Sequence, residues 1–274
     1  MKNNQQMGNT NYPNYGYLFY YDYYNSENNS VSKNNKAHDA ILNAKVSKKE
    51  FEGLQLKTIY PGLVLGTGYT HNLKGADGFK IGFYFDHTSG LPVIPGASIK
   101  GALRNAFPGR QSKIYKNPKN KLVQKRRAKK IEEAKYNYMA SILPSEKIKN
   151  LNQTEIENLI DEIELEIFEG KVKEEGKEKK LPTAKRDTFF NAEIIKGNKN
   201  GEIFGDDYIT HHKDPLKNPT PLMFLKILPN VTWGFNFKLH DGKISAKEKE
   251  ILFEKIILYF GLGAKTNLGY GQFE

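Results

Sequence analysis

The sequence predicts an α+β protein in which antiparallel strands pack beside helices. Residues 220–228 and 232–239 have strand patterns, and the turn Pro229-Asn230 between them predicts that they pair with each other. A helix is expected next, because Ser245 and Glu248 form a capping box and Gly261 provides a stop. At 274 residues the chain is long enough to bury a substantial core.

Composition narrows the class of protein. The net charge of +11 favours an acidic partner, nucleic acid first and an anionic membrane surface second. No apolar run approaches the roughly 18 residues that a membrane span needs, and the first residues lack the apolar core of a signal peptide. The absence of cysteine excludes disulfides and zinc–thiolate sites. We therefore expect a soluble, cytoplasmic protein with no membrane partner.

The N-terminal part contains a polar segment followed by strand patterns. Residues 1–36 are rich in Asn, Ser and Tyr, with polar flanks that are expected to be disordered. Their aromatic centre at 17–24 either packs on a neighbouring surface or stacks on bases. A strand that starts at Leu54 should break at the turn Pro61-Gly62, and residues 81–85 should add a short second strand.

A helix with two cations is expected after the turn Pro95-Gly96. Ser98 is its predicted N-cap, and Lys100 and Arg104 lie four residues apart on one face. A glycine-preceded helix start with cations along it suits phosphate binding, although an ordinary amphipathic helix with exposed cations fits the same pattern. Residues 37–108 and 181–274 together form the predicted main domain.

Residues 109–180 differ in charge and form a predicted helical insertion. Residues 110–130 contain ten Lys or Arg and no acid, whereas 155–169 contain seven acids and no base. Isoleucine and leucine at helical spacing in the acidic part predict an amphipathic helix. The basic arm is an RNA footprint, a solvated linker or a protein-docking surface. Residues 174–180 are predicted to be an exposed linker.

One segment has the residue types of a catalytic or metal site. Asp206, Asp207, His211, His212 and Asp214 offer oxygen and imidazole groups. Their spacing matches no ligand motif, so we expect no metal and no cofactor. A structural or RNA-facing loop is favoured, which comprises the following residues: Asp207, Thr210, His211 and His212.

The C-terminal loop, Gly261-Leu-Gly-Ala-Lys-Thr-Asn-Leu-Gly-Tyr-Gly271, contains four glycines around Lys265. Glycine lets backbone amides approach an anion closely. The loop follows a helix whose predicted apolar stripe is Ile251, Leu252, Lys255, Ile256 and Tyr259, and it should enter a last strand at 270–273. It is no nucleotide-binding P-loop, which needs a strand before it and a helix after it.

Three stretches together resemble the RAMP superfamily, the RNA-binding subunits of CRISPR effector complexes. Ile94-Pro-Gly-Ala-Ser-Ile-Lys-Gly-Ala-Leu-Arg104 is similar to its IPGSSLKGxLR signature, with Ala97 at the usual serine. The 261–271 loop is similar to its C-terminal glycine-rich loop. Residues 207–212 and 219–225, with Asn14-Tyr-Gly-Tyr-Leu-Phe, resemble the sixth subunit of the Cmr (type III-B) complex, although the proline before His211 is absent.

The resemblance implies a ferredoxin-like βαββαβ fold, similar to RNA-recognition domains, with a groove for CRISPR RNA. Residues expected to contact the RNA lie in the two end motifs: Ser98, Lys100, Arg104, Gly263, Lys265, Thr266, Asn267 and Tyr270. It also implies a non-catalytic subunit that binds the 3′-side region of the CRISPR RNA. Such a subunit caps the filament and has as partners the target RNA and other Cmr subunits, especially the repeating backbone subunit and the head subunit.

Two alternatives remain open at this point. One is a metal-independent endoribonuclease of the same superfamily that processes CRISPR RNA with His211 or His212 as general base, or a metal-dependent variant that uses Asp206, Asp207 and His211. The other is a protein-docking subunit whose charges at 110–130 face acidic neighbours.

Overall fold

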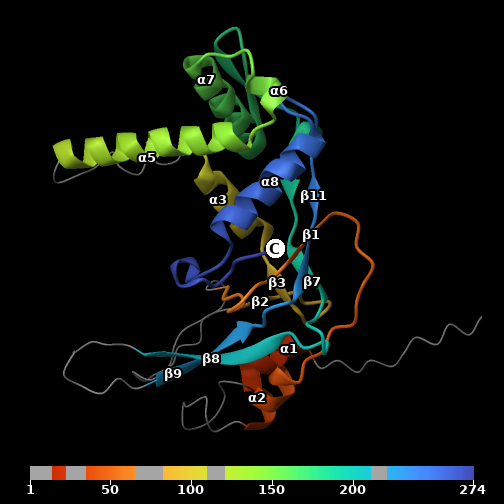
Figure 1. Cartoon of the computed structure of the whole chain (residues 1–274). Coiled ribbons are helices and arrows are strands. Elements are labelled where there is room, and N and C mark those ends of the chain that lie inside the picture. The colour runs from red at the N-terminus through yellow and green to blue at the C-terminus, as the bar shows by residue number, and fades with distance from the viewer. Residues whose placement is uncertain (1–13, 23–34, 66–82, 110–120, 211–220) are drawn as a thin grey trace, which may run out of the picture.

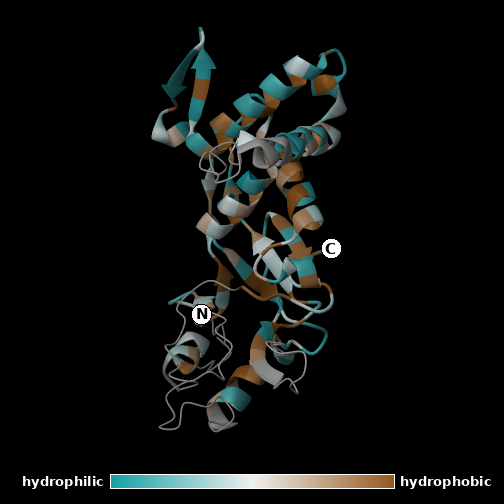
Figure 2. Ribbon diagram, turned by 90° about the vertical axis from the view of Figure 1, so that its left-hand side faces the viewer, coloured by the Kyte–Doolittle hydropathy of each residue, from teal (hydrophilic) through white to brown (hydrophobic). Residues whose placement is uncertain are grey.

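The computed structural model describes residues 14–22, 35–65, 83–109, 121–210 and 221–274. A central sheet with two helices occupies the middle of the molecule in Figure 1. The insertion lies above the sheet, and a two-stranded hairpin with the N-terminal helices lies below it. Figure 2 shows hydrophobic residues along the inner surfaces of the middle part and mostly hydrophilic residues on the hairpin at the top.

The central sheet has the ferredoxin-like topology. Its strands are ordered β1 (Leu54–Lys57), β10 (Thr232–Phe235), β7 (Ala192–Lys196), β3 (Pro92–Ile94) and β2 (Tyr84–Phe85), and neighbours are antiparallel. The chain end pairs outside β1, where Lys57 N–H donates to Glu274 O and Glu274 N–H to Lys57 O, both at 2.8 Å. With α3 between β1 and β7 and α8 before the chain end, these elements form the expected βαββαβ unit, and the β2–β3 hairpin widens it.

Two helices cover one face of this sheet. They are α3 (Gly96–Ala106) and α8 (Ala246–Phe260), which contact each other. Trp233 pairs with Leu56 on one side and Ile194 on the other, and all three side chains are buried in the core. This row has the same sidedness because alternate residues of a strand face the same way.

Helix α8 begins at the predicted capping box, in which Ser245 Oγ accepts a bond from Glu248 N–H at 3.2 Å. The predicted apolar stripe was wrong at its edges, because Ile251 and Tyr259 are 42% and 67% exposed. The buried positions of α8 are Lys249, Leu252, Phe253, Ile256 and Ile257. A buried lysine shifted the stripe, since the pattern analysis counts only apolar side chains.

The predicted pairing of 220–228 with 232–239 was wrong. Strand β9 (Pro221–Ile227) pairs instead with β8 (Phe204–Thr210) in a separate hairpin, while β10 joins the central sheet. Thr58 lies where the chain crosses between the two sheets: its hydroxyl donates to Leu228 O at 2.8 Å, and its carbonyl accepts from Asn230 N–H at 2.6 Å. These bonds to a third segment hold the turn open, so its two arms do not pair.

The N-terminal aromatic residues pack into the core as far as the structure describes them. Helix α1 (Tyr15–Tyr17) continues into a π-helical turn (Leu18–Asp22), and α2 (Asn35–Leu42) follows. Phe19 is 1% exposed, and its ring centroid lies 5.5 Å from that of Phe83. Packing of the aromatic centre on a neighbouring surface is therefore observed for this residue.

The insertion is helical, but it ends in a hairpin. Its helices are α5 (Lys121–Ile142), α6 (Ser145–Ile148) and α7 (Gln153–Glu164), followed by a π-helical turn (Leu165–Glu169). The expectation of a linker at 174–180 was wrong, because β4 (Lys171–Glu174) and β5 (Lys177–Lys180) pair around a turn at Gly176, where φ is +76°. Helix α5 projects away from the body in Figure 1.

The remaining elements are short. A 3-10 turn (Thr183–Lys185) leads from the hairpin to β6 (Thr188–Phe189), which pairs with β11 (Phe237–Lys238). A second 3-10 turn (Thr266–Leu268) lies in the glycine-rich loop. Within the described ranges, no helix is long and apolar enough to cross a bilayer.

Candidate nucleic-acid interface

The structure brings the two glycine-containing motifs together across 160 residues of sequence. Leu262 and Gly263 of the C-terminal loop face Ser98 and Ala102 of α3 across a groove of about 280 Å³. Leu65 and Ile94 complete its lining. The loop is held there by the backbone, since Ala264 N–H donates to Val64 O at 2.6 Å and Gly271 N–H to Gly62 O at 2.8 Å. Both walls of the groove are therefore attached to the core of the domain.

Ser98 lines this groove, but it is not the helix cap. The N-cap of α3 is Pro95, so Ser98 is the third helical residue, and its N–H donates to Pro95 O at 2.8 Å. The side chain of Asn191 caps the helix start by accepting a bond from Gly96 N–H at 3.0 Å. Ser98 and Ala102 lie one turn apart, which places both on the face towards the groove.

The two cations of α3 have other neighbours. Lys100 Nζ lies 5.5 Å from the centroid of the Phe189 ring, and Arg104 reaches the insertion. Its Nη2 is 2.6 Å from Glu169 Oε1, and its Nε is 3.4 Å from Glu164 Oε1. Positions 100 and 104 are about 200° around the helix from 98 and 102. The structure therefore separates Lys100 and Arg104 from the groove that Ser98 and Gly263 line.

The environment of these charges shifts three pKa values. Burial, followed by the neighbouring Arg104, lowers the pKa of Lys100. The hydrogen bond from Arg104 lowers the pKa of Glu169. Burial raises the pKa of Glu164, against the opposing effects of its bonds from Gly109 N–H and Arg104. Arg104 thus acts here as the counter-charge of the acidic helix.

Three glycines of the C-terminal loop are required by the protein's own backbone. Gly261, Gly263 and Gly271 have φ values of +69°, +91° and +71°. A Cβ atom at these positions would overlap Gly271 O, Val64 O and Leu262 O respectively. The prediction that the glycines allow close approach to a ligand is thus replaced, at these three positions, by close approach of one protein strand to another.

Much of the loop's backbone already donates within the protein. The amides that do so are those of Gly261, Leu262, Ala264, Leu268, Gly269 and Gly271. The tip of the loop carries the predicted polar side chains. Lys265 has φ +60° and precedes the 3-10 turn, where Thr266 is half-buried and Asn267 is exposed. Side chains at this tip, more than a cradle of amides, are what the loop presents beside the groove.

Tyr270 belongs to a buried cluster behind the loop. Its hydroxyl donates to Asp207 Oδ2 at 2.6 Å, and Lys226 Nζ lies 2.6 Å from the same oxygen. The Tyr270 side chain is 8% exposed, and burial together with Asp207 raises its pKa. Burial acts to raise the pKa of Asp207, but the bonds from Lys226 and Tyr270 outweigh it and hold that pKa low. The cluster joins the loop to the β8–β9 hairpin.

The predicted acid–histidine segment is mostly strand. Asp206, Asp207 and Thr210 lie on β8, so the expectation of a loop was wrong for them, because β9 supplies a partner over 221–227. Asp206 Oδ2 is 2.9 Å from His38 Nε2 of α2. His211, His212 and Asp214 lie outside the described residues. Within the described part of the chain, no three His, Asp or Glu side chains are grouped as a metal site.

Sequence reasoning missed the partners of the predicted residues. Glu164 and Glu169 bind Arg104, Lys226 binds Asp207, and Asn191 caps α3. The net opposite charge of 155–169 was the available signal for the first pair. No local signal identifies the other two, because they depend on strand register.

Comparisons with known proteins follow from this geometry. The family model of the RAMP superfamily matches residues 55–274. A chain in the structure of the type III-B Cmr-beta complex bound to cognate target RNA is 22% identical, with a TM-score of 0.45. The match covers 81% of the present chain and 56% of that one. Cmr6 from Pyrococcus furiosus is 20% identical, with a TM-score of 0.42, over 80% of this chain and 94% of the other.

No curated protein sequence resembles the chain closely enough to count as a match. The family model, however, spans both walls of the groove, the βαββαβ sheet and the insertion between them. The chain belongs to the RAMP superfamily.

Proposed function

We propose that the chain is a non-catalytic, RNA-binding subunit of a type III-B CRISPR (Cmr) effector complex. In this proposal it works in the cytoplasm, binds the 3′-side region of the CRISPR RNA and caps the filament of repeating backbone subunits. Its other partners are the head subunit and the target RNA. The RNA lies along the groove between α3 and the glycine-rich loop.

The observation that supports this proposal is the meeting of two distant motifs. Ser98 and Gly263 come from the two stretches that resemble the superfamily signatures, and they line one groove. Lys265, Thr266 and Asn267 stand at the tip of the loop beside it. The groove walls are mainly apolar and the tip is polar, which suits a sugar–phosphate strand held by few charges.

The chemistry fits a ligand of variable sequence. Contacts to phosphates and sugars position a nucleic acid without reading its bases. A chain with a net charge of +11 attracts such a strand over a distance, and salt weakens the attraction. Tyr270 is buried against Asp207, so its role here is to hold the loop in place and not to stack on a base.

The test is the RNA affinity of a Lys265→Gln variant of the full chain. We expect weaker binding of single-stranded CRISPR repeat RNA and a salt slope lower by about 0.7, the value for one lost phosphate contact. Lys238→Gln is the matched control, because Lys238 is an exposed lysine on β11. Equal affinity and slope in both variants would overturn the assignment of the groove.

Catalysis is tested separately. The His211→Ala/His212→Ala variant removes both imidazoles that could act as a general base. In the proposed function neither the wild type nor this variant cleaves repeat RNA, with or without EDTA. Cleavage by the wild type that the double variant lacks would favour the endoribonuclease instead, and EDTA-sensitive cleavage would indicate a metal site.

A further inference from the structure

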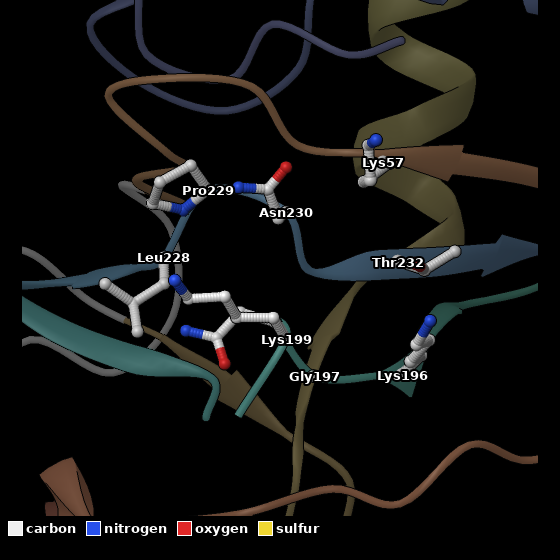
Figure 3. A pocket seen from close by; sticks show the side chains of 9 residues that line it. Lys57, Lys196, Gly197, Lys199, Leu228, Pro229, Asn230 and Thr232 are labelled. Carbon is white, nitrogen blue, oxygen red and sulfur yellow. The ribbon is translucent and has the colours of Figure 1, made fainter. Parts of the chain in front are cut away.

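A second basic hollow lies on the sheet, away from the groove. It has a volume of about 450 Å³, and its lining includes Lys57, Lys196, Lys199, Asn198, Asn230 and Thr232. Figure 3 shows Lys57 and Lys196 on neighbouring strands to either side of Thr232, with Lys199 and Asn230 across the hollow. No acidic side chain lines it.

Strand register places the hollow on the face opposite the helices. Lys57 pairs with Thr232, and Thr232 pairs with Lys196, so the three residues form one row across β1, β10 and β7. The adjacent row, Leu56 and Trp233, is buried under α3 and α8. Because sidedness alternates along a strand, Lys57 and Thr232 face away from the helices.

The hollow is separate from the groove. Ile94, which lines the groove, pairs with Ala192 at the start of β7, whereas Lys196 ends that strand. Four residues of strand separate the two positions by about 13 Å. A ligand in one site therefore does not occupy the other.

A tight turn holds Lys199 beside the row. Gly201 N–H donates to Asn198 O at 2.9 Å, and Asn198 Oδ1 accepts from Asn200 N–H at 2.9 Å and Glu202 N–H at 3.0 Å. These bonds close the turn and leave the exposed Lys199 side chain at its tip.

The nearest acids are engaged elsewhere. Glu202 accepts bonds from the side-chain amides of Asn198 and Asn200, which lower its pKa. Glu274 forms an ion pair with Lys57, but both side chains are about half exposed. Exposed pairs of this kind contribute little, about 0–1 kcal/mol in general, so a phosphate can displace the carboxylate.

We infer that this lysine hollow binds a phosphate of the RNA backbone, as a second RNA contact beyond the groove. The inference extends the proposed RNA-binding function. RNA-recognition sheets usually present aromatic side chains on which bases stack. This end of the sheet presents lysines, a hydroxyl and amides, which are donors for phosphate oxygens. The backbones of Lys57 and Lys196 are two strand spacings apart, about 10 Å, so their long side chains can reach one phosphate or two successive ones.

The test compares two double variants of the full chain in binding to labelled single-stranded RNA between about 50 and 200 mM salt. Lys196→Gln/Lys199→Gln removes two charges from the hollow, and Lys238→Gln/Lys247→Gln removes two exposed charges from β11 and α8. We expect the first pair to lower the salt slope by about 0.7 per lost contact. This corresponds to about a five-fold loss of affinity per contact at about 0.1 M salt, relative to 1 M.

Equal slopes and affinities in the two double variants would overturn the inference. A wild type that fails to bind RNA would instead remove the proposed function itself. Loss of binding in Lys265→Gln with none in Lys196→Gln/Lys199→Gln would leave the groove and remove only the hollow. Calorimetry with inorganic phosphate separates the sources: binding that the hollow variant loses, with an unchanged RNA slope, would indicate a small-anion site and also contradict the inference.

Discussion

Lys249 carries a charge into the core of the protein, where it is 1% exposed. Its Nζ donates to Glu166 Oε1 and Asp187 Oδ2, both at 2.8 Å, and to His240 O at 2.7 Å. All three ammonium protons therefore have acceptors, which a buried charge requires. Glu166 belongs to the insertion and Lys249 to α8, so this one side chain joins two parts of the fold.

Replacement of Lys249 tests the importance of this network. We expect Lys249→Met to lower the free energy of unfolding by about 3–5 kcal/mol, because two buried carboxylates would lose their counter-charge. Urea denaturation measures the loss. Lys247→Met in the same helix changes an exposed lysine and should stay within about 0.5 kcal/mol. A similar small effect at position 249 would contradict the structural role.

His38 makes stability depend on pH near neutrality. The hydrogen bond with Asp206 raises its pKa above the usual 6.5, against the lowering effect of burial. A raised pKa in the folded state means that the protonated form stabilises the fold. This contribution is complete below about pH 6.5 and is lost as the pH rises through the raised pKa.

The prediction is a pH-dependent difference between wild type and His38→Gln. The difference in free energy of unfolding should be largest near pH 5.5–6 (roughly one unit below the ordinary histidine pKa) and should shrink above neutrality. Chemical denaturation across this range measures it. His87→Gln, at an exposed histidine, is the control and should show no such trend. A constant difference at position 38 would exclude the linkage.

At the scale of elements, the glycine-rich loop is a rigid part of the sheet's edge. Gly271 and Gly269 have similar φ values of +71° and +88°. A Cβ at Gly271 would overlap Leu262 O, whereas at Gly269 the nearest atom is Pro61 Cδ at 3.5 Å. The two positions therefore share backbone strain and differ in the space around them.

This pair of glycines separates strain from steric overlap. Gly269→Ala should cost about 1–2 kcal/mol, the general cost of a left-handed conformation for a residue with a Cβ. Gly271→Ala should cost clearly more, because the backbone of Leu262 must also move. Thermal or urea denaturation gives both values. If the two substitutions cost the same, the loop has freedom that the structure does not show.

For the whole molecule, the insertion is built into the core. Ile160, Ile163 and Ile167 are at most 1% exposed and belong to the same cluster as Trp233 of the sheet. Glu164 and Glu169 bind Arg104 of α3, and Glu166 binds Lys249 of α8. Residues 109–180 thus support the two helices that cover the sheet, whatever further partners they have.

Deletion of the insertion should therefore unfold the domain. We expect a chain without residues 110–180 to lose cooperative unfolding, because it exposes core side chains and leaves Lys249 without Glu166. Near- and far-ultraviolet circular dichroism during urea titration checks this. The control removes only 171–180, whose ends are already adjacent: Leu181 N–H donates to Gly170 O at 2.7 Å. A cooperative, fully folded long deletion would show that the insertion is an independent unit.

Much of the fold follows from local signals. The capping box at Ser245, the stop at Gly261 and the helical spacing of the insertion's isoleucines were confirmed, because caps and periodicity act within a few residues. The family motifs at 94–104 and 261–271 likewise predicted the βαββαβ sheet. The candidate groove could be expected from them, although its lining residues could not.

The sequence by itself determined where helices begin and end, the basic charge and the family. The tertiary structure decided which strand pairs with which, so that β9 joined β8 and not β10. It also decided that Arg104 meets Glu164 and Glu169, and that Lys57, Thr232 and Lys196 form one row. The physical reason is range: caps and periodicity depend on neighbours along the chain, whereas partners and register depend on contacts between segments far apart in sequence.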